Sequence, residues 1–265
     1  MNDISKLYYY SERGMVNAIV LSIYKYKEAM FHFLKCIKTI NDESIFENIN
    51  LKDIKEVSIF NEFSLNGFGD PDLIIRVDFY DKESKLFFIE AKVKTYEESV
   101  KGQTIFVNDS YRVKGNSSRI NFQLRLKQRF VNAYKTYLKD SNDKIISNED
   151  NNYDYKERVL KKKSIINFLN NYIMKDIDIE NVYYVSMTSN NNNPYRNINS
   201  VFLPFKRNED GYNKLCYLLY KYIDIKQEED TRKNVVLYND TKEMFKFAFK
   251  LAEDNYVPEE DEGDD

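Results

Sequence analysis

The sequence predicts a layered α/β domain, and two kinds of pattern lead to this class. Apolar residues recur at spacings of three and four over 11–38 and over 120–138, which is typical of amphipathic helices. Runs of strand composition cover 57–65, 73–93 and 182–189, and their apolar character favours a sheet covered on both faces. The predicted order is therefore helix, three strands, helix, strand and further helices, with no internal repeat.

The first half of the chain carries the clearest element signals. Ser11 can cap the first helix, which places Glu12 in its first turn. After the strand at 57–65, the turn NGFGDP leads into the strand LIIRVDFY, and the tight turn DKES leads into LFFIEAKV. These last two strands predict a β-hairpin over residues 73–93.

The second half is predicted from its helix at 120–138 onwards. VYYVSMTS at 182–189 is a strong buried strand. The remaining expectations are a polar excursion at 140–154, a helix at about 156–174, a short strand at 201–205, and helices at about 211–223 and 241–253.

Length and composition indicate one domain. The chain has 265 residues, of which 42% are hydrophobic, enough to build a core. We expect a single domain over 1–258, with its core at about 11–189 and a helical C-terminal extension at about 205–255. Residues 259–265 carry six acids and no base, so this tail is predicted to be disordered.

Composition also excludes several kinds of site. The single histidine, His32, cannot supply a histidine metal cluster, and its place on an apparent helix favours a structural role. Two distant cysteines, Cys36 and Cys216, cannot form a cysteine-based zinc or iron–sulfur site. No apolar run reaches the ~18 residues of a membrane helix, and no secretion signal is visible, so we expect a cytoplasmic protein. Any enzymatic chemistry must then come from carboxylates, lysine or a metal held by oxygen ligands.

Two acidic patches lie on the predicted hairpin. Glu90 and Lys92 are two apart on a strand, so their side chains share a face, and the turn predicts that Asp72 pairs at about position 92 or 93. Two neighbouring carboxylates repel each other, and a hard cation such as Mg²⁺ would relieve this repulsion. A buried Glu–Lys ion pair or a solvent-exposed strand end is the alternative, and Asp70 is favoured as a turn residue over a second-metal ligand.

Pro71-Asp72 followed by Glu90-Ala91-Lys92 resembles the PD-(D/E)XK nuclease superfamily. The resemblance implies the restriction-endonuclease-like fold, an αβββαβ core with a central mixed sheet flanked by helices. It also implies that Asp72, Glu90 and the backbone carbonyl of Ala91 hold Mg²⁺, with Mn²⁺ as a plausible substitute. Lys92 would then orient or activate the attacking water.

The resemblance extends to two further positions. Glu12 matches an acidic residue of the first core helix that often completes the site, and Gln123 matches a glutamine on the helix after the third strand. Position 127 is lysine where that pattern has tyrosine. The absence of a cysteine quartet excludes the iron–sulfur members.

Positive charge is concentrated between residues 111 and 139, which hold eight bases and no acid. A one-sign stretch of this length favours phosphate contact about as strongly as it favours a solvated helix face. A duplex cut on both strands would also be compatible with a two-fold homodimer. The candidate nucleic-acid contacts are Lys94, Arg112, Lys114, Arg119, Arg125, Lys127 and Arg129.

These patterns favour a Mg²⁺-dependent DNA endonuclease of a restriction or anti-phage defence type, with double-stranded DNA as its expected partner. One alternative keeps the fold without catalysis, as a nucleic-acid-binding or assembly module. Another is an interaction protein that uses its tyrosine-rich helices and acidic tail.

Overall fold

The computed structural model describes residues 11–24, 27–92, 103–107, 110–114, 120–140, 144–147, 157–188, 193–195, 205 and 207–220. Its helices are α1 (Ser11–Ile23), α2 (Lys27–Lys35), α4 (Ile120–Asp140) and α5 (Lys163–Phe168). Its strands are β1 (Lys38–Thr39), β2 (Ile54–Asn61), β3 (Leu73–Phe79), β4 (Lys85–Lys92), β5 (Gln103–Val107), β6 (Ser110–Lys114), β7 (Ile145–Ser147), β8 (Arg158–Leu160), β9 (Val182–Thr188) and β10 (Leu215–Leu219).

A six-stranded mixed sheet forms the centre of the molecule, with strand order β1-β10-β9-β4-β3-β2. Strands β2, β3 and β4 form an antiparallel meander, whereas β9 runs parallel to β4 and β10 runs parallel to β9. Strands β5 and β6, and strands β7 and β8, form two separate antiparallel pairs. The α/β class predicted from the sequence is confirmed.

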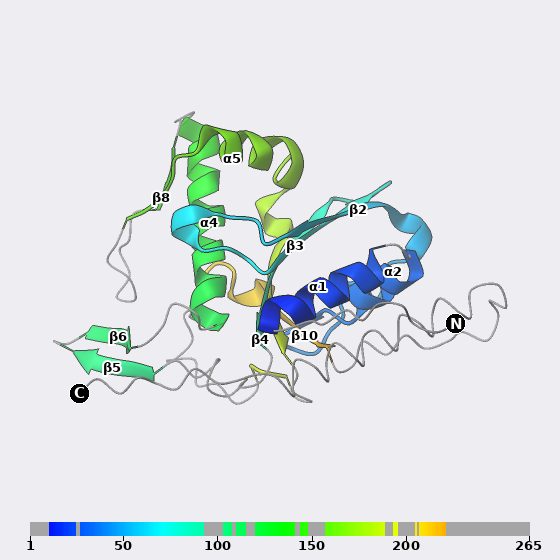
Figure 1. Ribbon diagram of the computed structural model, residues 1–265, viewed down its shortest axis with the longest axis horizontal. Helices are drawn as coiled ribbons and strands as arrows, with labels where there is room; N and C mark the ends of the chain where they lie inside the picture. The colour runs from blue at the N-terminus through cyan, green and yellow to red at the C-terminus, as the bar shows by residue number, and fades with distance from the viewer. Residues whose placement is uncertain are drawn as a thin grey trace, which may run out of the picture.

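Helices cover both faces of this sheet (Figure 1). One face packs against α1 and α2 and includes Phe87, Ile89 and Ala91 of β4. The other face packs against α4 and α5 and includes Leu86 and Phe88. Because side chains alternate along a strand, Glu90 and Lys92 lie on the α4 face. None of the described helices is long and apolar enough to cross a membrane.

Several predicted elements are present with small changes. The hairpin over 73–93 is formed by β3 and β4, the helix at 120–138 is α4, and the strand at 182–189 is β9. The helix predicted over 11–38 is divided into α1 and α2.

Three predicted assignments are wrong. Residues 211–223 were expected to be helical, but a 3-10 turn at Tyr212–Lys214 leads into β10, whose five side chains are all buried. A short apolar run fits a buried strand or a buried helix equally well, and pairing with β9 decides for the strand. The helix expected at 156–174 begins with β8, continues as α5 and ends in a π-helical turn at Leu169–Ile173. The polar excursion at 140–154 contains β7.

The described C-terminal part is therefore not a helical extension. Because β10 belongs to the central sheet, the core extends past residue 189. The helix expected at 241–253, most of the short strand at 201–205 and the acidic tail at 259–265 lie outside the described residues.

Candidate metal centre

The candidate site lies where β3 begins and β4 ends. The pairing of Leu73 with Ile89 puts Asp72 level with Glu90 rather than with position 92 or 93, so the predicted register is wrong by two or three residues. The turn is centred at residue 81, midway between the paired residues, and not at 82 or 83. The register error does not separate the predicted residues, because Asp72 and Glu90 still lie at the same end of adjacent strands.

Asp72 caps the backbone where the β3–β4 pairing stops. Its Oδ2 accepts a hydrogen bond of 2.7 Å from the N–H of Ala91. Burial raises the pKa of Asp72, while this hydrogen bond and the positive charges of Lys92 and Lys127 oppose the rise. The carboxylate is thus held against the backbone of β4, beside the cations of the site.

Glu90 is buried, with 3% of its surface exposed, in a strand whose other interior residues are all apolar. Burial raises the pKa of Glu90 to about 7; the positive charge of Lys127 opposes the rise and the negative charge of Asp72 adds to it. Lys127 Nζ lies 2.6 Å from Glu90 Oε1, and the lysine is fully buried. A buried glutamate therefore has a buried lysine of α4 as its direct counter-ion.

Lys127 is positioned by its own helix and by the turn before β3. Its Nζ donates a 3.1 Å hydrogen bond to Oε1 of Gln123, one helical turn earlier. Gly69 has a φ of +73°, and a Cβ at this position would lie 2.7 Å from Gln123 Oε1. The turn can approach α4 this closely only because residue 69 has no side chain.

From the sequence, Lys127 was expected to contact phosphate; its pairing with Glu90 was not predicted. A signal was present, because Lys127 lies between the buried residues Leu124 and Val131 at helical spacings of three and four. A lysine on the apolar stripe of a helix requires a partner within the protein.

Polar side chains of β9 extend the site across the sheet. In the parallel β4–β9 ladder, Glu90 lies opposite Ser186 and Lys92 lies opposite Thr188. Lys92 is half-buried at the end of its strand. Thr188 Oγ1 is buried and has no hydrogen-bond partner among the described residues. Neither hydroxyl was predicted as part of the site, although both stand in a largely apolar strand.

Asp70 has the turn role that was expected of it. Its Oδ1 accepts a 3.1 Å hydrogen bond from the N–H of Leu65, which closes the loop before β3. Its side chain is exposed and contributes to the turn.

Three predicted phosphate contacts do not fit their positions. Arg125, Lys127 and Arg129 are all buried on α4. Arg125 pairs with Glu209 through contacts of 2.7 Å and 3.3 Å, and its guanidinium lies 5.5 Å from the ring centre of Phe205. These bases are enclosed because α4 is covered on all sides here, and every residue from 124 to 131 is buried. Lys94 and Arg119 lie outside the described residues, as do the side chains of Arg112 and Lys114 on β6.

The start of α1 lies near Asp72, because the charge of Arg13 acts on that carboxylate. Glu12 is the preceding residue on α1, and its side chain lies outside the described part of the chain. Within the described ranges, no group of three histidine, cysteine, aspartate or glutamate side chains gathers as a metal site. The carboxylates of Asp72 and Glu90, together with backbone carbonyls, would offer a metal only oxygen donors, which suits Mg²⁺ or Mn²⁺ better than zinc.

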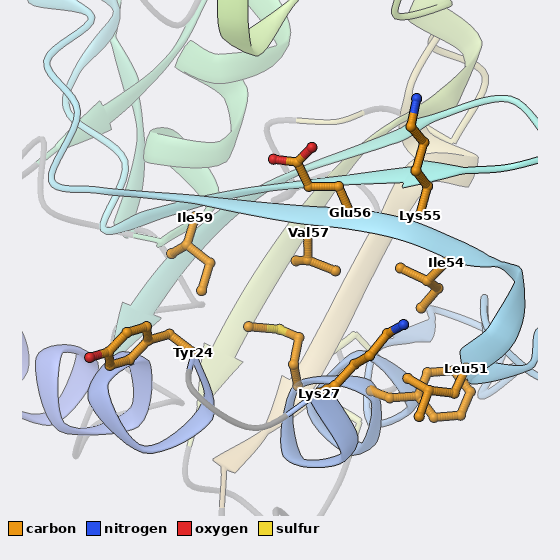
Figure 2. A pocket seen from close by; sticks show the side chains of 10 residues that line it. Tyr24, Lys27, Leu51, Ile54, Lys55, Glu56, Val57 and Ile59 are labelled. Atoms are coloured by element: carbon orange, nitrogen blue, oxygen red, sulfur yellow. The ribbon is translucent and has the colours of Figure 1, made fainter.

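A separate pocket lies on the opposite side of the sheet, between β2 and the two N-terminal helices (Figure 2). Tyr24, Lys27, Val57 and Ile59 are among its lining residues, and Glu56 is its only carboxylate. This pocket lacks paired acids, so the described end of β3 and β4 is the better candidate for metal chemistry.

No protein-family model matches the chain, and no curated protein or solved structure is similar enough to count as a match.

Proposed function

We propose that this chain is a divalent-metal-dependent nuclease of the PD-(D/E)XK type that hydrolyses DNA, in a restriction or anti-phage defence role. The observation that supports the proposal is the meeting of Asp72, Glu90 and Lys92 at one end of adjacent strands, from motifs far apart in the chain. A buried glutamate beside a half-buried aspartate, with lysines around them, costs desolvation free energy, and such groups concentrate at functional sites.

The order of elements supports the same proposal. Helix α1, the meander β2–β3–β4, helix α4 and the parallel strand β9 follow the αβββαβ order of that superfamily. The metal-site residues lie at the ends of β3 and β4, which the central sheet holds in place.

Each residue has a distinct role in the proposed reaction. Mg²⁺ or Mn²⁺, when bound, would supply positive charge at the phosphate and lower the pKa of the attacking water. Asp72, Glu90 and the carbonyl of Ala91 would hold this ion. Lys92, at the half-buried end of β4, would place its ammonium beside the attacking water and the phosphate oxygens. Lys127 would orient Glu90 through their 2.6 Å contact.

The proposal is tested by plasmid nicking in Mg²⁺, in Mn²⁺ and in EDTA. We expect Asp72→Asn and Lys92→Met each to lower the cleavage rate by about 100-fold or more, as removal of a charge-stabilising group does in other enzymes. Asp70→Asn is the matched control, because an asparagine oxygen can still accept the turn hydrogen bond from Leu65. It should cleave like the wild type.

A second measurement does not depend on cleavage. Mn²⁺ should raise the melting temperature of the wild type and of Asp70→Asn, but not of Asp72→Asn, because a ligand that binds only the folded state stabilises it. Cleavage that survives both Asp72→Asn and Lys92→Met would contradict the proposal. Nucleic-acid binding without any cleavage by the wild type would instead favour the catalytically silent binding module.

A further inference from the structure

A group of aromatic side chains lies on the surface at α5 and at the π-helical turn that follows it. Phe168 and Tyr172 are 37% and 59% exposed, and their ring centres are 4.7 Å apart. Phe168 also stacks on Phe63 at 5.4 Å and meets the edge of Phe60 at 5.9 Å. The inner rings thus support Phe168 from below, and Phe168 and Tyr172 together present an aromatic surface to solvent.

Positive charge lies at the start of the helix that ends at Phe168. Lys161, Lys162 and Lys163 are consecutive and exposed, and they lead directly into α5. No ion pair or hydrogen bond joins them to another described side chain. Three adjacent ammonium groups without a described counter-ion form a surface that attracts anions.

This region is linked to the turn that carries the candidate site. Arg158 of β8 donates a 3.1 Å hydrogen bond to the carbonyl of Gly67, two residues before Gly69. In Figure 1, β8 leads into α5 near one end of α4, and the site residue Gln123 lies in the first turns of that helix, near its other end. The segment that leads into α5 is therefore connected through β8 to the turn that precedes Asp72.

The combination of charge and rings identifies the kind of partner. Lysines contact phosphates, and exposed aromatic rings stack on unpaired bases; together they are the usual components of a surface that binds single strands. The bases Arg125, Lys127 and Arg129 of α4 are enclosed by the fold, whereas the three lysines at the start of α5 are exposed and accessible to phosphates. An apolar protein partner would leave three lysines without a complementary charge.

We propose that the α5 surface, defined as Lys161, Lys162, Lys163, Phe168 and Tyr172, binds a nucleic-acid strand with unpaired bases. The lysine ammonium groups contact its phosphates, and the two rings stack on its bases. This inference rests on the proposed function in its choice of nucleic acid as partner, and it extends that function by naming a partly single-stranded substrate.

The test measures binding of the full chain to a fluorescent single-stranded DNA and to a blunt duplex of the same length, by anisotropy in EDTA. We expect the wild type to bind the single strand more tightly. The triple variant K161Q/K162Q/K163Q should lose about tenfold or more in affinity for both DNAs, and its salt slope for the single strand should fall by about two, at ~0.7 per lost contact.

Tyr172→Leu tests the proposed base stacking separately from the phosphate contacts. It should weaken single-strand binding by about tenfold and leave duplex binding and the salt slope unchanged, because stacking needs an unpaired base and releases no counterion. The matched control K38Q/K52Q/K55Q removes three exposed lysines near α2 and changes net charge by the same amount. It should bind both DNAs within about twofold of the wild type, since unrelated surface charges are largely screened.

The outcomes separate this inference from the proposed function. Equal losses in the two lysine variants, or a Tyr172→Leu variant that binds the single strand like the wild type, would overturn the inference even if the wild type cleaves DNA. Selective losses in the α5 variants of a protein that never cleaves would support the inference and remove the nuclease proposal. A wild type that neither binds nor cleaves nucleic acid would overturn both.

Discussion

Replacing Lys127 by methionine removes the counter-ion of Glu90 while keeping an unbranched side chain of similar length. In the wild type, Nζ and Oε1 are 2.6 Å apart and both side chains are buried. Removing one partner of such a pair leaves an uncompensated charge, which typically lowers the free energy of unfolding by about 3–5 kcal/mol. We expect a loss of this size at alkaline pH, where Glu90 is ionised in the folded variant as well as in the folded wild type.

The pH dependence of that loss follows from Glu90. Burial raises its pKa from 4.5 to about 7, so the folded wild type binds this proton more tightly than the unfolded chain does. Unfolding free energy should therefore fall by about 3 kcal/mol as the pH rises from the unfolded pKa to the folded one. Without Lys127 the folded pKa moves higher still, so in Lys127→Met the fall continues to more alkaline pH. At a pH below the unfolded pKa, Glu90 is neutral in both proteins and the difference between them should be small.

Chemical denaturation followed by far-ultraviolet circular dichroism measures these values, since the chain has no tryptophan for fluorescence. The double variant Glu90→Gln/Lys127→Met should recover most of the loss, because it removes the unpaired charge as well. Lys135→Met is the control, an exposed lysine on the same helix, with an expected change within about 0.5 kcal/mol. A loss for Lys127→Met that is the same at acid and alkaline pH, or a double variant as unstable as the single one, would refute the reasoning.

Two further predictions concern the surroundings of the site. Gly69→Ala should lower the unfolding free energy by about 1–3 kcal/mol, because the φ of +73° and the contact with Gln123 both disfavour a side chain; a melting temperature equal to that of the wild type would contradict the close approach. Arg125→Met should cost about 2–4 kcal/mol of unfolding free energy through its lost pair with Glu209, yet leave the DNA affinity of the folded protein unchanged. If Arg125→Met instead lowers DNA affinity without changing the unfolding free energy, Arg125 contacts phosphate as the sequence predicted.

The candidate carboxylates could be predicted because they depend on local rules. Glu90 and Lys92 share a face through the two-residue period of a strand, and Asp72 lies one strand away across a short turn. The register was less certain, since it depends on how many residues the turn at 80–84 leaves unpaired. That error changed the partner of Asp72 without moving it from the site.

The fates of the basic residues could not be predicted from charge alone. Arg125 pairs with Glu209, 84 residues later, and Lys127 pairs with Glu90 on a strand of the central sheet. If Glu209 and Glu90 lay elsewhere in the fold, the same basic sequence could form an exposed helix. The strand at residues 215–219 also depends on a distant segment, because it forms by hydrogen bonding to the edge of β9 that β4 does not occupy.

The sequence by itself determined the α/β class, the hairpin and the pair of motifs on it, because side-chain periodicity and turn residues act between near neighbours. Tertiary structure alone decided which bases are buried, which strand completes the sheet and where the exposed lysines and aromatic rings gather. Those outcomes depend on contacts between segments far apart in the chain, whose energies arise only when both segments are packed together.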